Sequence, residues 1–153
     1  MADVTVEIVI EAPPDAVWSH ISDLGSHAEW MADAESIRFL TEQRSGVGTR
    51  MEVATKVGPL RTTDLMDVVA WEDDRQIVVR HRGVVAGTGS FTLEPDGAGR
   101  CRVIWHEALD LPKRLGGPVG GWAAAPMLRW VWRRNLRRLK HQIELGPQRG
   151  KDR

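Results

Sequence analysis

Apolar and polar residues alternate along most of the chain, which predicts a mainly β structure. In residues 4–11, Val4, Val6, Ile8 and Ile10 fall on one side of an extended segment, as in a strand with one buried face. Six more strand-like segments follow, and the short turns between them predict antiparallel neighbours. Their expected ranges are 36–42, 49–56, 61–71, 76–82, 87–94 and 100–109.

Three helices are expected. The first starts at Pro13-Pro14-Asp15, because proline suits a first helical turn and an acidic side chain is favourable there, and it ends at Gly25. A second, short helix is expected over residues 26–31. The third and longest runs from Pro126 to Leu145, with an apolar face at helical spacing. That face consists of Leu128, Val131, Trp132, Leu136, Leu139 and Ile143.

The segment 111–125, LPKRLGGPVGGWAAA, is the one unusual linker. Its glycines, prolines and small residues disfavour regular structure, yet it also carries Leu115, Val119 and Trp122. Two interpretations stay open. The segment is either a mobile lid over a cavity, or a crossover loop that includes a broken first turn of the last helix.

The widths of these elements predict the architecture. A helix about 10 Å across covers only about two strands at roughly 4.8 Å each, so a sheet of about seven strands must curve around the last helix. We therefore expect one α+β domain over residues 1–153 with two short helices after the first strand. Residues 146–153 are expected to form a disordered tail. Unless large side chains fill the concave side of the sheet, an internal cavity remains.

Charge is balanced overall but not along the chain. Residues 1–74 carry fifteen acidic and five basic side chains, and residues 75–153 carry six acidic and sixteen basic ones. The net charge of zero for the whole chain indicates no nucleic-acid partner. The single Cys101 excludes an internal disulfide. No apolar run reaches the roughly 18 residues of a membrane span, and the first residues resemble no signal peptide, so a cytoplasmic protein is expected.

Four stretches resemble the SRPBCC superfamily, which includes START-type lipid-binding domains and polyketide cyclases or dehydrases. They are IEAPPDAVWSHISDLGSHAEW, GVGTRMEV, DVVAWEDDRQIVVRHRG and GSFTLEPDGAGRCRVIW, and the resemblance covers roughly residues 3–145. It implies a helix-grip fold with a cavity between the sheet and the last helix, and a hydrophobic ligand. No cofactor is expected, and His20 and His27 lack a third ligand at a metal-binding spacing.

Strand phase indicates which side chains line that cavity. Between residues 61 and 71 the phase is ambiguous, because Val68 and Val69 are both apolar and a bulge would reset it. Met66 is expected on the inner face of this strand. Trp30 fits the cavity wall and core packing equally well. The expected ligand-binding residues are Trp30, Met51, Val53, Met66, Phe91, Trp105, Leu128, Trp132 and Leu136.

Two titratable side chains, His81 and Glu107, share the inward faces of their strands. In an enclosed apolar space they could form an acid–base pair, as aldol cyclisation of a polyketide requires. The alternatives are that both lie near strand ends open to water, or that His81 simply hydrogen-bonds to a neighbouring strand. The absence of tyrosine weakens the enzymatic interpretation, because cyclases of this superfamily commonly place tyrosine and arginine in the pocket.

The polar side of the last helix is strongly basic and lies next to Trp130. Such a helix can contact an anionic membrane peripherally; alternatively, its cations pair with the acidic first half of the chain or are merely solvated. The basic residues are Arg129, Arg133, Arg134, Arg137, Arg138 and Lys140.

These observations favour binding, and transport, of a hydrophobic small molecule such as a lipid, polyketide or isoprenoid. One alternative is a polyketide cyclase or dehydratase that uses His81 and Glu107. A second is a protein-interaction module with a filled interior and an exposed apolar patch around Trp122 and Trp130.

Overall fold

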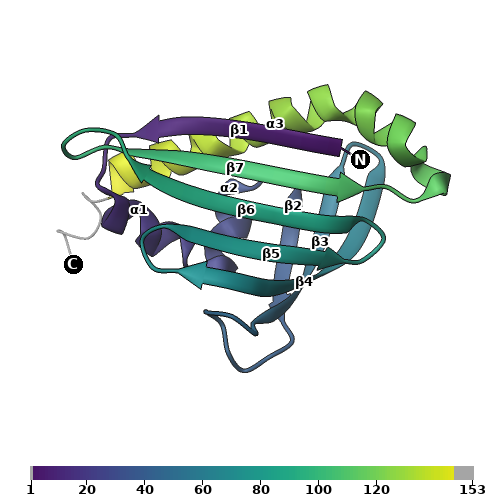
Figure 1. Ribbon diagram of the computed structural model, residues 1–153, viewed down its shortest axis with the longest axis horizontal. Helices are drawn as coiled ribbons and strands as arrows, with labels where there is room; N and C mark the ends of the chain where they lie inside the picture. The colour runs from purple at the N-terminus through teal and green to yellow at the C-terminus, as the bar shows by residue number, and fades with distance from the viewer. Residues whose placement is uncertain (1, 147–153) are drawn as a thin grey trace.

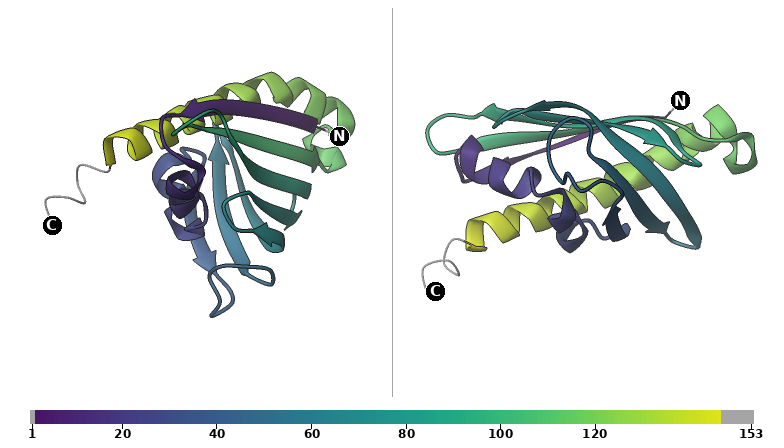
Figure 2. Two further views of the ribbon diagram at one scale, coloured as in Figure 1. Left: turned by 60° about the vertical axis from the view of Figure 1, so that its left-hand side comes forward. Right: turned by 90° about the horizontal axis from the view of Figure 1, so that it is seen from below.

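Seven antiparallel strands form one strongly curved sheet, and the long helix α3 (Gly117–Leu145) packs along it (Figure 1, Figure 2). A computed structural model describes residues 2–146, except the side chain of Leu60. The strand order is β1-β7-β6-β5-β4-β3-β2. The predicted α+β helix-grip architecture, with short helices after the first strand, is confirmed.

Most strands match the predicted ranges to within a few residues. The strands are β1 (Ala2–Ile10), β2 (Ala34–Phe39), β3 (Arg50–Val57), β4 (Leu60–Glu72), β5 (Gln76–Arg82), β6 (Ala86–Pro95) and β7 (Cys101–Asp110). The short helices are α1 (Pro14–Ile21) and α2 (His27–Trp30), with the 3₁₀ turns η1 (Leu24–Ser26) and η2 (Lys113–Leu115). The first helix ends at Ile21 and not at Gly25, which instead lies in η1. No helix within residues 2–146 has both the length and the apolarity needed to cross a membrane.

A β-bulge in β4 accounts for the ambiguous strand phase. The register between β4 and β5 shifts between Val68 and Ala70, so the extra residue Val69 is exposed while Val68 is buried. Before the bulge, Met66 pairs with His81. After it, Trp71 turns back toward the interior and makes an edge-to-face contact with Trp18 of α1, at 5.4 Å between ring centroids. The bulge lets both halves of this long strand contribute to one face.

The last helix begins at Gly117, earlier than the predicted Pro126, so residues 117–125 are not an irregular linker. Gly116 and Gly117 have φ values of 94° and 54°, a left-handed conformation that glycine adopts at little cost. Pro118 then suits the first turn. Gly121 packs against Ala2, where an added Cβ would lie 3.2 Å from the alanine methyl. Pro126 lies inside the helix. Of the predicted tail, Gly146 caps α3 and residues 147–153 lie outside the described part.

The second half of α3 completes the hydrophobic core. Leu136, Leu139 and Ile143 are fully buried and belong to the same core cluster as Val17 and Ile21 of α1. Burying an aliphatic side chain of this kind contributes about 1.5–3 kcal/mol. This end of the molecule is therefore packed solid and anchors the helix against the sheet.

Shortening one of these leucines should destabilise the fold. Leu136→Ala is expected to lower the free energy of unfolding by about 2–5 kcal/mol, because it removes buried methyl groups and leaves a cavity. Leu145→Ala is the matched control on the same helix; its side chain is exposed, so the change should stay within about 0.5 kcal/mol. Urea unfolding followed by circular dichroism measures both. Equal effects would contradict this assignment of the core.

Candidate functional site

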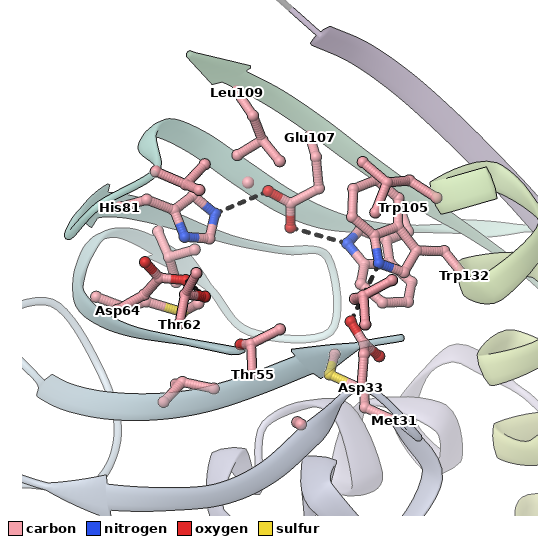
Figure 3. A pocket seen from close by; sticks show the side chains of 18 of the residues that line it. Met31, Asp33, Thr55, Thr62, Asp64, His81, Trp105, Glu107, Leu109 and Trp132 are labelled. Atoms are coloured by element: carbon pink, nitrogen blue, oxygen red, sulfur yellow. Dashed lines mark hydrogen bonds and ion pairs between the residues drawn. The ribbon is translucent and has the colours of Figure 1, made fainter. Parts of the chain in front are cut away.

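A pocket of about 420 Å³ lies between the concave face of the sheet and the first half of α3. It is partly open, and its walls are mainly apolar side chains from β2 to β7, α2, η2 and α3 (Figure 3). Volumes of about 300–1,000 Å³ are typical of small-molecule sites.

Seven of the nine residues expected to bind ligand line this pocket. They are Met51, Val53, Met66, Phe91, Trp105, Leu128 and Trp132. Trp30 and Leu136 are not among the lining residues and are fully buried in the core. Trp30 lies in an edge-to-face cluster with Phe91 and Trp105, at centroid distances of 5.8 and 6.0 Å. It supports two wall residues from behind and does not form the wall itself.

His81 and Glu107 meet inside the pocket, on β5 and β7 (Figure 3). His81 Nε2 lies 2.7 Å from Glu107 Oε2, and Trp105 Nε1–H donates to Glu107 Oε1 at 3.0 Å. The two residues are only 7% and 8% exposed. His81 lies one residue from the end of β5, but both side chains are withdrawn from water, unlike in the alternative interpretation. A buried carboxylate needs such partners, because an unpaired one is very costly.

Gly89 on β6 makes room for Glu107. A Cβ at this position would lie 2.5 Å from both carboxylate oxygens, so any larger residue would displace the carboxylate. The glycine thus fixes the position of Glu107 by allowing a close approach.

A further acidic side chain that lines the pocket, Asp64, was not anticipated. It faces inward from β4 in the same phase as Met66 and Val68, so strand alternation contained the signal. Its Oδ2 accepts a long hydrogen bond from Thr62 at 3.4 Å, and its buried Oδ1 has no partner among the described residues. Burial raises the pKa of Asp64, and the nearby charge of His81 opposes the rise.

The surroundings of His81 act on its pKa in opposite directions. Burial lowers the pKa, but the hydrogen bond to Glu107 and the negative charges of Glu107 and Asp64 together outweigh burial, so the pKa is raised. The imidazole therefore gains basicity from its two acidic neighbours.

A second polar group holds α3 against the segment after α2. Asn135 Nδ2 donates to Asp33 Oδ1 at 2.6 Å, Trp132 Nε1 donates to Asp33 Oδ2 at 3.3 Å, and Ala32 N donates to Asn135 Oδ1 at 3.0 Å. This arrangement orients Trp132, which stacks on Trp105 at 5.2 Å. Sequence reasoning missed Asp33 and Asn135 because neither lies in a periodic pattern that marks a site.

Within residues 2–146, no three His, Cys, Asp or Glu side chains gather in a way that could hold a metal ion. Burial raises the pKa of the Cys101 thiol to about 11, which makes it a poor nucleophile at neutral pH.

His27, which also lines the pocket, should make the fold sensitive to acid. Burial lowers its pKa from 6.5 to about 4, while its Nε2–H donates to Ile21 O at 2.8 Å. Between these pH values the unfolded chain binds a proton that the folded chain does not, so stability falls as pH falls.

The prediction is tested with His27→Gln, which keeps an N–H donor but cannot titrate. Relative to this variant, the wild type should lose about 2 kcal/mol of unfolding free energy between pH 7 and pH 5. The raised pKa of His81 acts in the opposite direction in both proteins and cancels in the comparison. A difference that does not change with pH would show that His27 is protonated normally in the fold.

Comparisons with known proteins agree with the fold. A search of curated proteins found no match. Solved structures with the same fold include a protein of Thermus thermophilus (18% identity, TM-score 0.74, covering 94% of this chain and 98% of that chain). A conserved protein of Geobacillus kaustophilus has 10% identity and a TM-score of 0.77, covering 93% and 95%. The Zhui aromatase/cyclase of a Streptomyces species, R1128, has 20% identity and a TM-score of 0.66, covering 93% of each chain.

At these identities the structures show a shared fold alone. The family model described as polyketide cyclase / dehydrase and lipid transport, however, matches residues 1–144, nearly the whole chain. The chain therefore belongs to the polyketide cyclase / dehydrase and lipid transport family, which is of the SRPBCC type.

Proposed function

We propose that the pocket binds a hydrophobic small molecule and that the protein carries it. The observation that supports this most is a mainly apolar space of about 420 Å³ inside the fold. Burying about 300 Å² of apolar ligand surface at about 25 cal/mol per Å² yields roughly 7 kcal/mol before the costs of association. Binding of this kind needs no reacting side chain. A protein-interaction module was expected to have a filled interior, so the pocket does not favour that alternative.

Filling the pocket should weaken binding. Met66→Trp places a larger ring among the lining residues, whereas Leu65→Trp alters the neighbouring, exposed position of the same strand. Titration with the neutral fluorescent probe 1-aminoanthracene should give one saturable site in the wild type and Leu65→Trp. In Met66→Trp the affinity should fall at least about tenfold, which corresponds to roughly 1.4 kcal/mol.

Two results would reject the binding proposal. One is the absence of a saturable site in the wild type. The other is equal affinity in both variants, with both folded as judged by circular dichroism. Native mass spectrometry of the purified protein adds the identity of any molecule that remains bound.

The buried His81–Glu107 pair supports a second candidate function, acid–base catalysis. The carboxylate of Glu107 accepts a hydrogen bond from His81 Nε2, which leaves Nδ1 for a ligand. This geometry resembles the arrangement in which one group orients a base. The raised pKa of His81 also favours proton uptake.

The proton transfers of an aldol cyclisation need no groups other than these two. His81 Nδ1 takes a proton from the carbon next to a ligand carbonyl, and the resulting enolate carbon attacks a second carbonyl carbon of the same ligand. The new alkoxide oxygen then takes the proton back from Nδ1–H. Glu107 holds the ring in position and stabilises its protonated form.

Removing either group should slow such a reaction. His81→Ala and Glu107→Gln are each expected to reduce turnover of a poly-β-keto mimic by roughly 10²–10⁴-fold. Binding of 1-aminoanthracene to each variant serves as the control for an intact pocket. Unchanged turnover with intact binding would eliminate catalysis by this pair and would leave the carrier function standing.

A further inference from the structure

The outer side of the first half of α3 exposes an unusual amount of apolar surface. Val119, Trp122 and Trp130 are 74%, 78% and 61% exposed, and Met127 is also exposed. Their spacing places them on the side of the helix opposite Gly121, which packs on Ala2. Single exposed apolar residues are ordinary, but two tryptophans on one helix face form a patch that indicates a binding surface.

Basic residues continue this face toward the second half of the helix. Arg133, Arg134 and Arg137 are exposed, and none of them takes part in the ion pairs found within residues 2–146. Arg134 instead lies over the Trp130 ring, with its guanidinium carbon 5.5 Å from the ring centroid. These three cations therefore do not pair with the acidic first half of the chain and face solvent.

The same end of α3 forms part of the pocket rim. Met127 belongs both to the exposed patch and to the pocket lining, together with Leu111 and Leu115 of the β7–α3 connection. Val57 and Val85, next to the β3–β4 and β5–β6 turns, line the pocket as well. In Figure 1 the β5–β6 turn and the start of α3 lie at the same end of the molecule.

We propose that this face of α3, comprising Val119, Trp122, Met127, Trp130, Arg133, Arg134 and Arg137, docks the protein on an anionic membrane. A helix with an apolar, tryptophan-bearing segment and clustered arginines lies in the plane of a lipid interface, with rings at the headgroup level and guanidinium groups on phosphates. Arginine matches phosphate geometry well. Docking brings the pocket rim to the bilayer, where a hydrophobic guest can pass without crossing water; that last step alone rests on the proposed function.

An acidic protein could also attract the arginines. The membrane is the better fit because the two tryptophans and Val119 project from one helix face beside the charges, and an acyl-chain boundary accepts such side chains without a shaped partner pocket.

Co-sedimentation with vesicles tests the docking. The protein should bind phosphatidylcholine vesicles containing phosphatidylglycerol, and bind pure phosphatidylcholine vesicles far more weakly. At about 1 kcal/mol per basic residue, each arginine contributes roughly fivefold, so Arg133→Gln/Arg134→Gln/Arg137→Gln should weaken partitioning on the order of 100-fold. Trp122→Ala/Trp130→Ala should weaken it by at least about tenfold and should abolish fluorescence quenching by lipids with brominated acyl chains.

Matched surface changes elsewhere provide the controls. Arg80→Gln and Val47→Ser alter exposed residues of β5 and the β2–β3 loop and should leave vesicle binding unchanged. Met66→Trp should also bind vesicles normally, so loss of the pocket and loss of docking are distinguishable. Three results would each overturn the proposal. The first is that the wild type fails to bind anionic vesicles, and the second is that the helix variants bind them as tightly as the wild type. The third is salt-sensitive capture by an acidic protein without vesicle binding.

Discussion

The width of one helix relative to a seven-stranded sheet determines the rest of this structure. Helix α3 packs chiefly along β1, at the edge of the sheet, and touches β7 much less. The second half of α3 packs in the core together with residues of α1. The pocket separates its first half from β3, β4 and β5. The curvature of the sheet brings those strands round without closing the gap. The pocket is thus the space between sheet and helix that α3 is too narrow to fill.

Hydrogen bonds compensate to different degrees for the burial of the two acidic side chains Glu107 and Asp64. Glu107 receives two hydrogen bonds, from His81 and Trp105, and is held closely by Gly89. Asp64 has weaker support, with one buried oxygen unpaired among the described residues. A buried polar atom without a partner costs free energy, so under the proposed function a ligand with a hydrogen-bond donor would be favoured next to Asp64. Under the proposed carrier function, the apolar walls would supply affinity and the polar corner would orient the ligand.

Much of the fold follows from local patterns in the sequence. Alternation identified the strands, and the adjacent Val68 and Val69 pointed to the bulge that the register shift between Val68 and Ala70 confirms. The meeting of His81 and Glu107 followed from strand phase, because both side chains point to the concave face. The start of α3 did not follow, since glycine-rich segments form helices only where tertiary contacts, such as Gly121 on Ala2, compensate for poor propensity. The role of Asp33 depends on its contact with Asn135 across about 100 residues, and no local pattern encodes that contact.

The pairing of β1 with β7 has a consequence for how the chain is made. Ala2 lies opposite Leu109 and Ile10 opposite Cys101, so β1 leaves the ribosome long before β7, its one neighbour in the described sheet. Until β7 arrives, β1 presents an unsatisfied backbone edge and an apolar face, which are the features that favour aggregation. Loop closure over such a distance is also slow. Newly made chains should therefore depend on rapid completion of synthesis, or on a chaperone that shields the waiting strand, more than the stability of the finished protein would suggest.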